Sequence, residues 1–140
     1  MKKILTFTIV MISLLIIGCS SKNGPKAVDN EFLSDVSKAT EARWEYLDKT
    51  TEESESIYLK EAVQKELNIL EKYKELNDEE KIFNDPKLKK IAEDYIDALN
   101  TQIESIKYYT SDSIKYMEQW SEGYNKRSTL LVKLVDEYGL

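Results

Sequence analysis

The stretch Thr110-Ser111-Asp112-Ser113 decides how many helices this chain forms. Its residues are poor helix formers and good helix caps, and they interrupt a run of mostly apolar residues spaced three and four apart between Leu88 and Tyr138. A single helix of about 50 residues here would be about 75 Å long, and two shorter helices could cover only half of it. The stretch therefore predicts a tight turn between two helices.

The segments on either side of this turn each carry one stripe that should face a core. The first helix is expected to begin at Asn84-Asp85-Pro86, where a cap residue precedes a proline at the first helical position. The second is expected over residues 112–138, with Gly139 as its C-terminal cap. The predicted core stripes are Leu88, Ala92, Tyr95, Leu99, Gln102 and Ile106 in the first helix, and Met117, Trp120, Tyr124, Arg127, Leu131 and Leu134 in the second.

Two more amphipathic helices are predicted upstream, over residues 28–48 and 52–76. Their expected core faces are Leu33, Val36, Thr40, Arg43 or Trp44, and Leu47 in the first, and Leu59, Val63, Glu66 or Leu67, Leu70 and Tyr73 in the second. Ile82 and Phe83 are expected to plug the end of the core. Four helices with short links predict an all-α, antiparallel up-down helical bundle over residues 28–140. The alternative is three helices, with one long C-terminal helix.

The N-terminal segment has the pattern of a secretory signal. Lys2 and Lys3 precede an almost unbroken apolar run, Ile4–Ile17, of about 14 residues. A membrane-spanning helix needs about 20 apolar residues, and this run gives way to polar residues after Gly18. A cleaved signal peptide is therefore favoured over the alternative, an uncleaved signal anchor.

The sequence Ile16-Ile17-Gly18-Cys19 resembles the lipobox of bacterial lipoproteins, Leu-x-Gly/Ala-Cys, with Ile16 in place of the preferred leucine. The resemblance implies cleavage after Gly18 and a diacylglycerol on Cys19, with a further N-acyl chain as an option. Residues 1–18 would then be a signal peptide, and residues 19–27 the lipidated cysteine and a flexible tether. The protein would be held at the extracytoplasmic face of the cell membrane. The alternative is a buried cysteine behind an ordinary signal peptide.

The rest of the chain loosely resembles uncharacterised helical lipoproteins of Gram-positive bacteria. The stretches 120–127 and 134–139 carry this resemblance, which brings no known active residues with it. Removal of residues 1–18 takes away two lysines and no acid, which leaves 18 basic and 26 acidic side chains and a net charge of about −8. This charge argues against nucleic acid as a partner and against adsorption onto anionic lipid.

Residues suited to catalysis are scarce. The chain has no histidine, and its single cysteine is the expected lipid site. No phosphate-binding loop or nucleophile elbow occurs, and the carboxylate runs at 52–55 and 78–80 lack the ligand spacing of a calcium loop. The sequence therefore predicts no enzyme, no metal site and no cofactor apart from the covalent lipid.

Tyrosines offer the best candidates for a binding surface. Tyr108 and Tyr116 lie off the predicted core stripe and could line a groove, although aromatic residues more often fill a core. Gln102, Ser113 and Arg127 lie on the stripe, where polar side chains fix helix register or mark a small polar pocket.

The favoured function is a membrane-anchored protein-interaction or scaffold module. The alternatives are a lipoprotein that binds a small ligand, peptide or cell-wall fragment, and a phage-exclusion or immunity lipoprotein. The expected partner is another protein, with a homodimer as an alternative.

Overall fold

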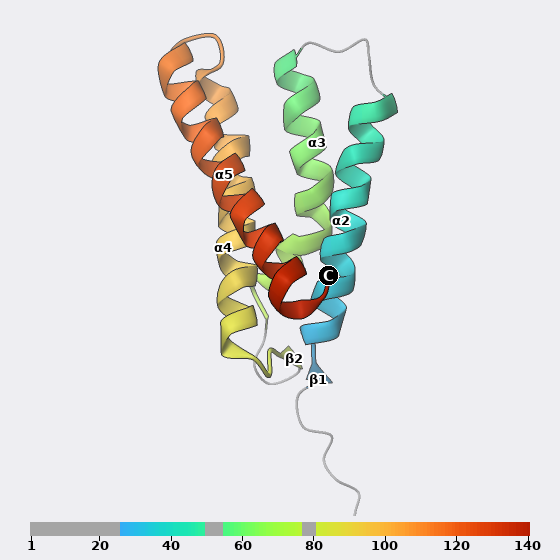
Figure 1. The fold of residues 1–140 in the computed structure, drawn as a ribbon. Coiled ribbons are helices and arrows are strands. Elements are labelled where there is room, and N and C mark those ends of the chain that lie inside the picture. The colour runs from blue at the N-terminus through green and yellow to red at the C-terminus, as the bar shows by residue number, and fades with distance from the viewer. Residues whose placement is uncertain (1–25, 50–54, 77–80) are drawn as a thin grey trace, which may run out of the picture.

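The computed structural model describes residues 26–49, 55–76 and 81–140. Its four long helices are α2 (Asp29–Lys49), α3 (Glu55–Leu70), α4 (Pro86–Ser105) and α5 (Ser113–Tyr138), which run alternately up and down (Figure 1). The short elements are strands β1 (Lys26–Ala27) and β2 (Lys81–Ile82) and the 3-10 turns η1 (Glu71–Tyr73) and η2 (Ile106–Tyr108). The predicted all-α four-helix fold is confirmed, and the alternative with one long C-terminal helix is wrong.

The chain reverses between α4 and α5 at the predicted turn. The backbone N–H of Asp112 donates to the carbonyl of Tyr108 at 2.9 Å, and the Asp112 carboxylate accepts from the backbone N–H of Lys115 at 3.0 Å. Asp112 therefore caps α5, because it satisfies one of the free N–H groups of the first turn. At the other end Gly139 has a φ of 69°, a left-handed conformation that suits a residue without a Cβ atom.

The helices pack as two hairpins, α2 with α3 and α4 with α5, and α3 joins the hairpins by packing on α4. Figure 1 shows that the hairpins lie together near β1 and β2 and diverge toward the α4–α5 turn. In the upper part of the first hairpin, the Tyr58 hydroxyl donates to the Leu47 carbonyl, and the Tyr58 ring lies 5.9 Å from that of Tyr46. Along most of their length α2 and α5 have few close backbone contacts, so the bundle is open on that side.

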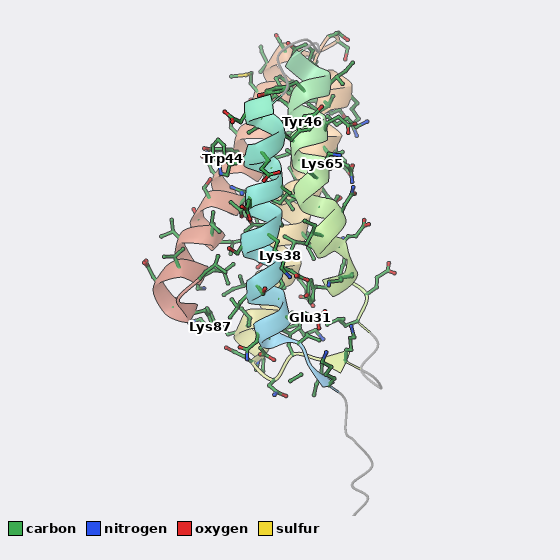
Figure 2. All side chains as sticks on the ribbon, turned by 90° about the vertical axis from the view of Figure 1, so that its right-hand side faces the viewer. Glu31, Lys38, Trp44, Tyr46, Lys65 and Lys87 are labelled. Atoms are coloured by element: carbon green, nitrogen blue, oxygen red, sulfur yellow. The ribbon has the colours of Figure 1, made fainter. Side chains whose placement is uncertain are left out.

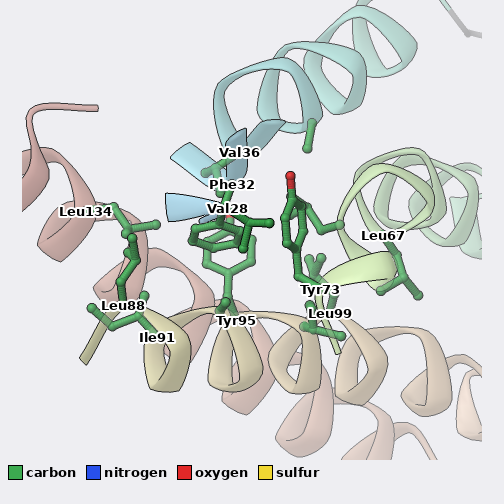
Figure 3. Close-up of a cluster of buried hydrophobic side chains, with 14 of the residues drawn as sticks. Val28, Phe32, Val36, Leu67, Tyr73, Leu88, Ile91, Tyr95, Leu99 and Leu134 are labelled. Atoms are coloured by element: carbon green, nitrogen blue, oxygen red, sulfur yellow. The ribbon is translucent and has the colours of Figure 1, made fainter. Parts of the chain in front are cut away.

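The hydrophobic core lies in the half of the bundle next to β1 and β2, which is the lower half in Figure 1. Figure 3 shows its side chains in close-up. The Phe32 ring meets Tyr73 and Phe83 edge-on, with centroid distances of 5.1 and 5.6 Å, so Phe83 plugs the end of the core as predicted. Leu134 is fully buried and brings the end of α5 into the same cluster. The lower half therefore holds all four helices together.

The end of the bundle where α2 begins is closed by backbone pairing between β1 and β2. Lys26 and Ala27, which the sequence analysis placed in the tether, pair in parallel with Lys81 and Ile82. The Asp29 carboxylate accepts hydrogen bonds from the backbone N–H groups of Asn84 and Asp85, both at 2.9 Å. These contacts fix the start of α2 against the start of α4.

Helix α5 buries only part of the stripe predicted for it: Arg127 and Leu134 are buried as expected, but the first half of the helix differs. Met117 and Tyr124, which were expected in the core, are 59% and 48% exposed, and Trp120 is only partly buried. Gly123 instead lies against α4: a Cβ atom there would stand 2.6 Å from the carbonyl oxygen of Ala98. The prediction was wrong for the first half of α5 because it carried the spacing of α4 across the turn. In the second half the predicted and the observed stripes coincide at Arg127 and Leu134.

Candidate functional site

A buried polar cluster joins all four helices. It consists of Arg43 from α2, Glu66 from α3, Tyr95 from α4 and Arg127 from α5, and each of these side chains is less than one tenth exposed. Arg43 Nη1 donates to Glu66 Oε2 at 2.9 Å, and Arg127 Nε lies 2.8 and 2.9 Å from the two carboxylate oxygens. The Tyr95 hydroxyl donates to Oε1 at 2.5 Å. The Glu66 carboxylate therefore connects α3 to the other three helices.

This cluster has a structural role and offers no reactive group to a substrate. Two guanidinium groups face one carboxylate, and burial together with the Glu66 charge raises the pKa of the Tyr95 hydroxyl. A carboxylate with both oxygens occupied by donors has no free lone pair aimed at a substrate. The cluster therefore fixes the register of the four helices relative to one another. The expectation that Arg127 lies in the seam of the bundle is confirmed, because its side chain is buried in this cluster.

Gln102, the other polar residue expected in the seam, is fully buried on α4. Neither its amide oxygen nor its amide nitrogen has a hydrogen-bond partner within the described residues. It lies where α5 comes closest, because a Cβ atom on Gly123 would be 2.7 Å from Gln102 Cγ. Ser113, the third seam candidate, is instead exposed at the start of α5.

A groove of about 520 Å³ runs along the open side of the bundle, between α2 and the end of α5. Trp44 stands at its edge, 63% exposed, and Figure 2 shows its side chain on the flank of α2 that faces α5. The wall on α5 is aliphatic, whereas the α2 wall mixes hydroxyl, carboxylate and indole groups. We call this feature the α2–α5 groove; it is lined by Ser37, Thr40, Glu41, Trp44, Leu131, Val135 and Leu140.

The surface of α5 beside this groove is also apolar. Among the described residues, most of the large hydrophobic side chains that remain exposed belong to this one helix: Ile114, Met117, Tyr124, Val132 and Val135. A helix that exposes such a face in a bundle usually packs against something else. The α2–α5 groove and this face form the strongest candidate for a binding surface in the described part of the chain.

A second hollow, of about 550 Å³, lies between α3 and α4 and is more polar. The two lysines that line it already form ion pairs within the protein. Lys72 Nζ lies 2.7 Å from Asp35 Oδ2, and Lys74 Nζ lies 3.0 Å from Asp97 Oδ1. Since these charges are satisfied internally, the hollow has less to offer a partner than the α2–α5 groove.

The two tyrosines predicted to form a binding surface have different environments. Tyr108 is half-buried, with Lys115 Nζ 4.1 Å from the centre of its ring, and a hydrogen bond with Lys115 lowers the pKa of its hydroxyl. Tyr116 is only 8% exposed and packs against Tyr109 and Trp120, at centroid distances of 5.0 and 6.0 Å. The prediction of Tyr116 as a surface residue is therefore wrong, because the phase of α5 turns it toward α4.

The expected lipidation site, Cys19, and the cleavage position after Gly18 lie outside the described residues. No helix in the described part of the chain is long and apolar enough to cross a membrane. Within the same residues, no three acidic, histidine or cysteine side chains come together as a metal site.

The α2–α5 groove was not predicted from the sequence because either Arg43 or Trp44 could lie on the core face of the first helix. The signal was ambiguous, since Arg43 and Trp44 were equally compatible with the stripe; the structure buries Arg43 and exposes Trp44. Comparisons of the chain with protein-family models, curated proteins and solved structures found no match. The function is therefore inferred from the geometry of this surface and from the N-terminal sequence.

Proposed function

We propose that this protein is a lipid-anchored lipoprotein of the extracytoplasmic membrane face and that it offers the α2–α5 groove to a protein partner. The observation that carries the proposal is the indole of Trp44, which is largely exposed beside the α2–α5 groove, on a side of the bundle where α2 and α5 have few close backbone contacts. Exposed aromatic side chains next to apolar hollows are typical of residues that dominate protein interfaces.

The position of β1, where the described part of the chain begins, supports the membrane attachment. The chain enters the bundle at β1, at the end opposite the α4–α5 turn (Figure 1). The seven residues from Cys19 to Lys26 can span at most about 25 Å, so a lipid on Cys19 would hold the β1 end of the bundle close to the membrane. Two acyl chains give stable anchoring where one is marginal. The exposed face of α5 runs along the long axis of the bundle, so it would look sideways above the membrane and stay open to other extracytoplasmic proteins.

The anchor is tested with Cys19→Ala. We expect the full-length variant to lose fatty-acid label and to leave the membrane fraction, because the chain has no other cysteine to carry the lipid. The measurement is metabolic labelling with a radioactive fatty acid, followed by fractionation. Label that persists on the variant would show that the proposed lipoprotein assignment is wrong.

The groove is tested by photo-crosslinking from position 44 in the full-length, membrane-bound protein. A photoreactive phenylalanine analogue in place of Trp44 should capture a protein, whereas the same analogue at Ile57, which is 52% exposed on α3 and outside the groove, should not. Equal capture from both positions, or none from position 44, would rule out the groove as the interaction surface.

A further inference from the structure

We propose that the occupant of the α2–α5 groove is a cationic amphipathic helix of another polypeptide. This inference rests on the function proposed above and names the chemical class of its partner.

The shape of the groove favours a helix. On α2 the exposed residues Ser37, Glu41, Trp44 and Asp48 follow one another at spacings of four, three and four, so they form a straight row about 16 Å long. Opposite this row, Leu131 and Val135 are separated by one turn of α5. A helix of a partner that lies between α2 and α5 would contact both rows over about three of its turns. This is the helix-in-groove mode of recognition.

Backbone chemistry disfavours an extended peptide. The walls of the groove are helices, whose interior N–H and C=O groups are already bonded within each helix. Apart from the free carbonyl groups of the last turn of α5, an extended segment would therefore find no backbone partners there, and most of its own polar groups would be buried unpaired against Leu131, Val135 and Leu140. A helix satisfies its backbone internally and brings only side chains to the contact.

Charge selects a basic helix. Glu41 lines the groove and Asp48 continues the same row one turn beyond Trp44, and within the described residues neither carboxylate forms an ion pair. The whole chain carries a formal charge of −6. Lysine or arginine side chains at the edge of the bound helix would neutralise both carboxylates, with the aliphatic parts of these side chains packed along the indole.

The same charges argue against a second copy of this chain. In a symmetric dimer the same patch of both subunits meets, so the acidic rows would be brought together without cations to neutralise them. Like-charge juxtaposition of this kind suppresses an otherwise compatible interface. The acidic residues of this row therefore favour a basic helix over a second copy of this chain as the occupant of the groove.

Binding is tested with the full-length lipoprotein in nanodiscs of zwitterionic lipid, with empty nanodiscs as the blank. The probe is a labelled synthetic helix of leucine and lysine, about 18 residues long, in which the leucines recur every three or four positions. Two control peptides are used: the same design with glutamate in place of lysine, and a shuffled leucine–lysine peptide without helical period. We expect the cationic helix to bind at least tenfold more tightly than either control in fluorescence anisotropy.

Matched variants locate the binding. Trp44→Ala should lower the affinity for the cationic helix by about tenfold or more. The double variant Glu41→Gln/Asp48→Asn should lower this affinity by about threefold to tenfold. The control variants are Ile57→Ala and the double variant Glu75→Gln/Glu104→Gln, which remove the same kinds of groups from exposed positions outside the groove. Both controls should bind like the native protein.

Failure of this inference and failure of the proposed function have different signatures. Equal binding of the cationic and anionic helices, or binding that Trp44→Ala leaves intact, would overturn the cationic helix as occupant. Photo-crosslinks from position 44 to a second copy of this chain would also overturn it, while keeping the groove as an interface. If the cationic helix does not bind and position 44 captures no protein, both proposals are wrong.

Discussion

At the scale of single residues, the fold depends on one carboxylate. Glu66 is fully buried and accepts hydrogen bonds from two arginines and a tyrosine of the other three helices. A buried ion pair adds little net stability compared with an apolar replacement, but removal of one partner leaves an unpaired charge in a region of low dielectric. Arg43 and Arg127 would be left in that state without Glu66.

We therefore expect Glu66→Gln to lower the free energy of unfolding by about 3–5 kcal/mol. Urea denaturation of the full-length protein, followed by circular dichroism, measures the loss. The control is Glu104→Gln, an exposed position on α4 where the change should stay within about 0.5 kcal/mol. A loss below about 1 kcal/mol for Glu66→Gln would mean that the arginines find other partners or water.

At the scale of secondary structure elements, local signals placed the start of α4 and both ends of α5, and tertiary contacts set the helix faces. Asp85 before Pro86, Asp112 before α5 and Gly139 after it all act as the sequence indicated. The face that α5 buries is instead set by the close approach of Gly123 to α4. No local property of the α5 sequence distinguishes the stripe that contains Met117 from the one that contains Tyr116.

The phase of α5 is tested by two neighbouring substitutions. We expect Tyr116→Ala to cost about 2–4 kcal/mol, because the ring is buried against Tyr109 and Trp120. Met117→Ala should cost less than about 0.5 kcal/mol, because its side chain is exposed. Thermal and urea unfolding of both variants gives the comparison, and the opposite order would mean that α5 is rotated from the orientation described.

At the scale of the whole molecule, ion pairs that link the helices make stability depend on pH. Burial of Asp35 opposes its charge, but hydrogen bonds from Lys72, Lys38 and Tyr73 outweigh it and lower the pKa of this carboxyl to about 2 from 3.8. Because the folded-state pKa is depressed, the stabilisation from Asp35 is fully present above about pH 4 and is lost as the pH falls toward 2.

We expect the urea midpoint of the native protein to fall between pH 4 and pH 2, and the fall to be smaller in Asp35→Asn, which has no carboxyl to protonate at this position. The matched control is Asp97→Asn, which breaks an exposed ion pair with Lys74 and should keep the native slope. The measurement is a series of urea melts at half-unit intervals of pH. An Asp35→Asn variant with the native slope would mean that other carboxyls cause the acid sensitivity.

The amino-acid sequence by itself determined the helical class, the starts of α4 and α5, the end of α5 and the turn at residues 110–113, whereas α3 ends at Leu70, earlier than the predicted residue 76. These features depend on backbone capping, proline and glycine geometry and apolar spacing, which act within a few residues along the chain. The tertiary structure alone decided that Arg43 and Arg127 share one carboxylate, that Tyr116 is buried, and that Trp44 stands beside an open groove. The physical reason is that these properties depend on how four helices rotate and tilt against one another. That arrangement is set by contacts between residues far apart in the sequence, such as Gly123 against Ala98.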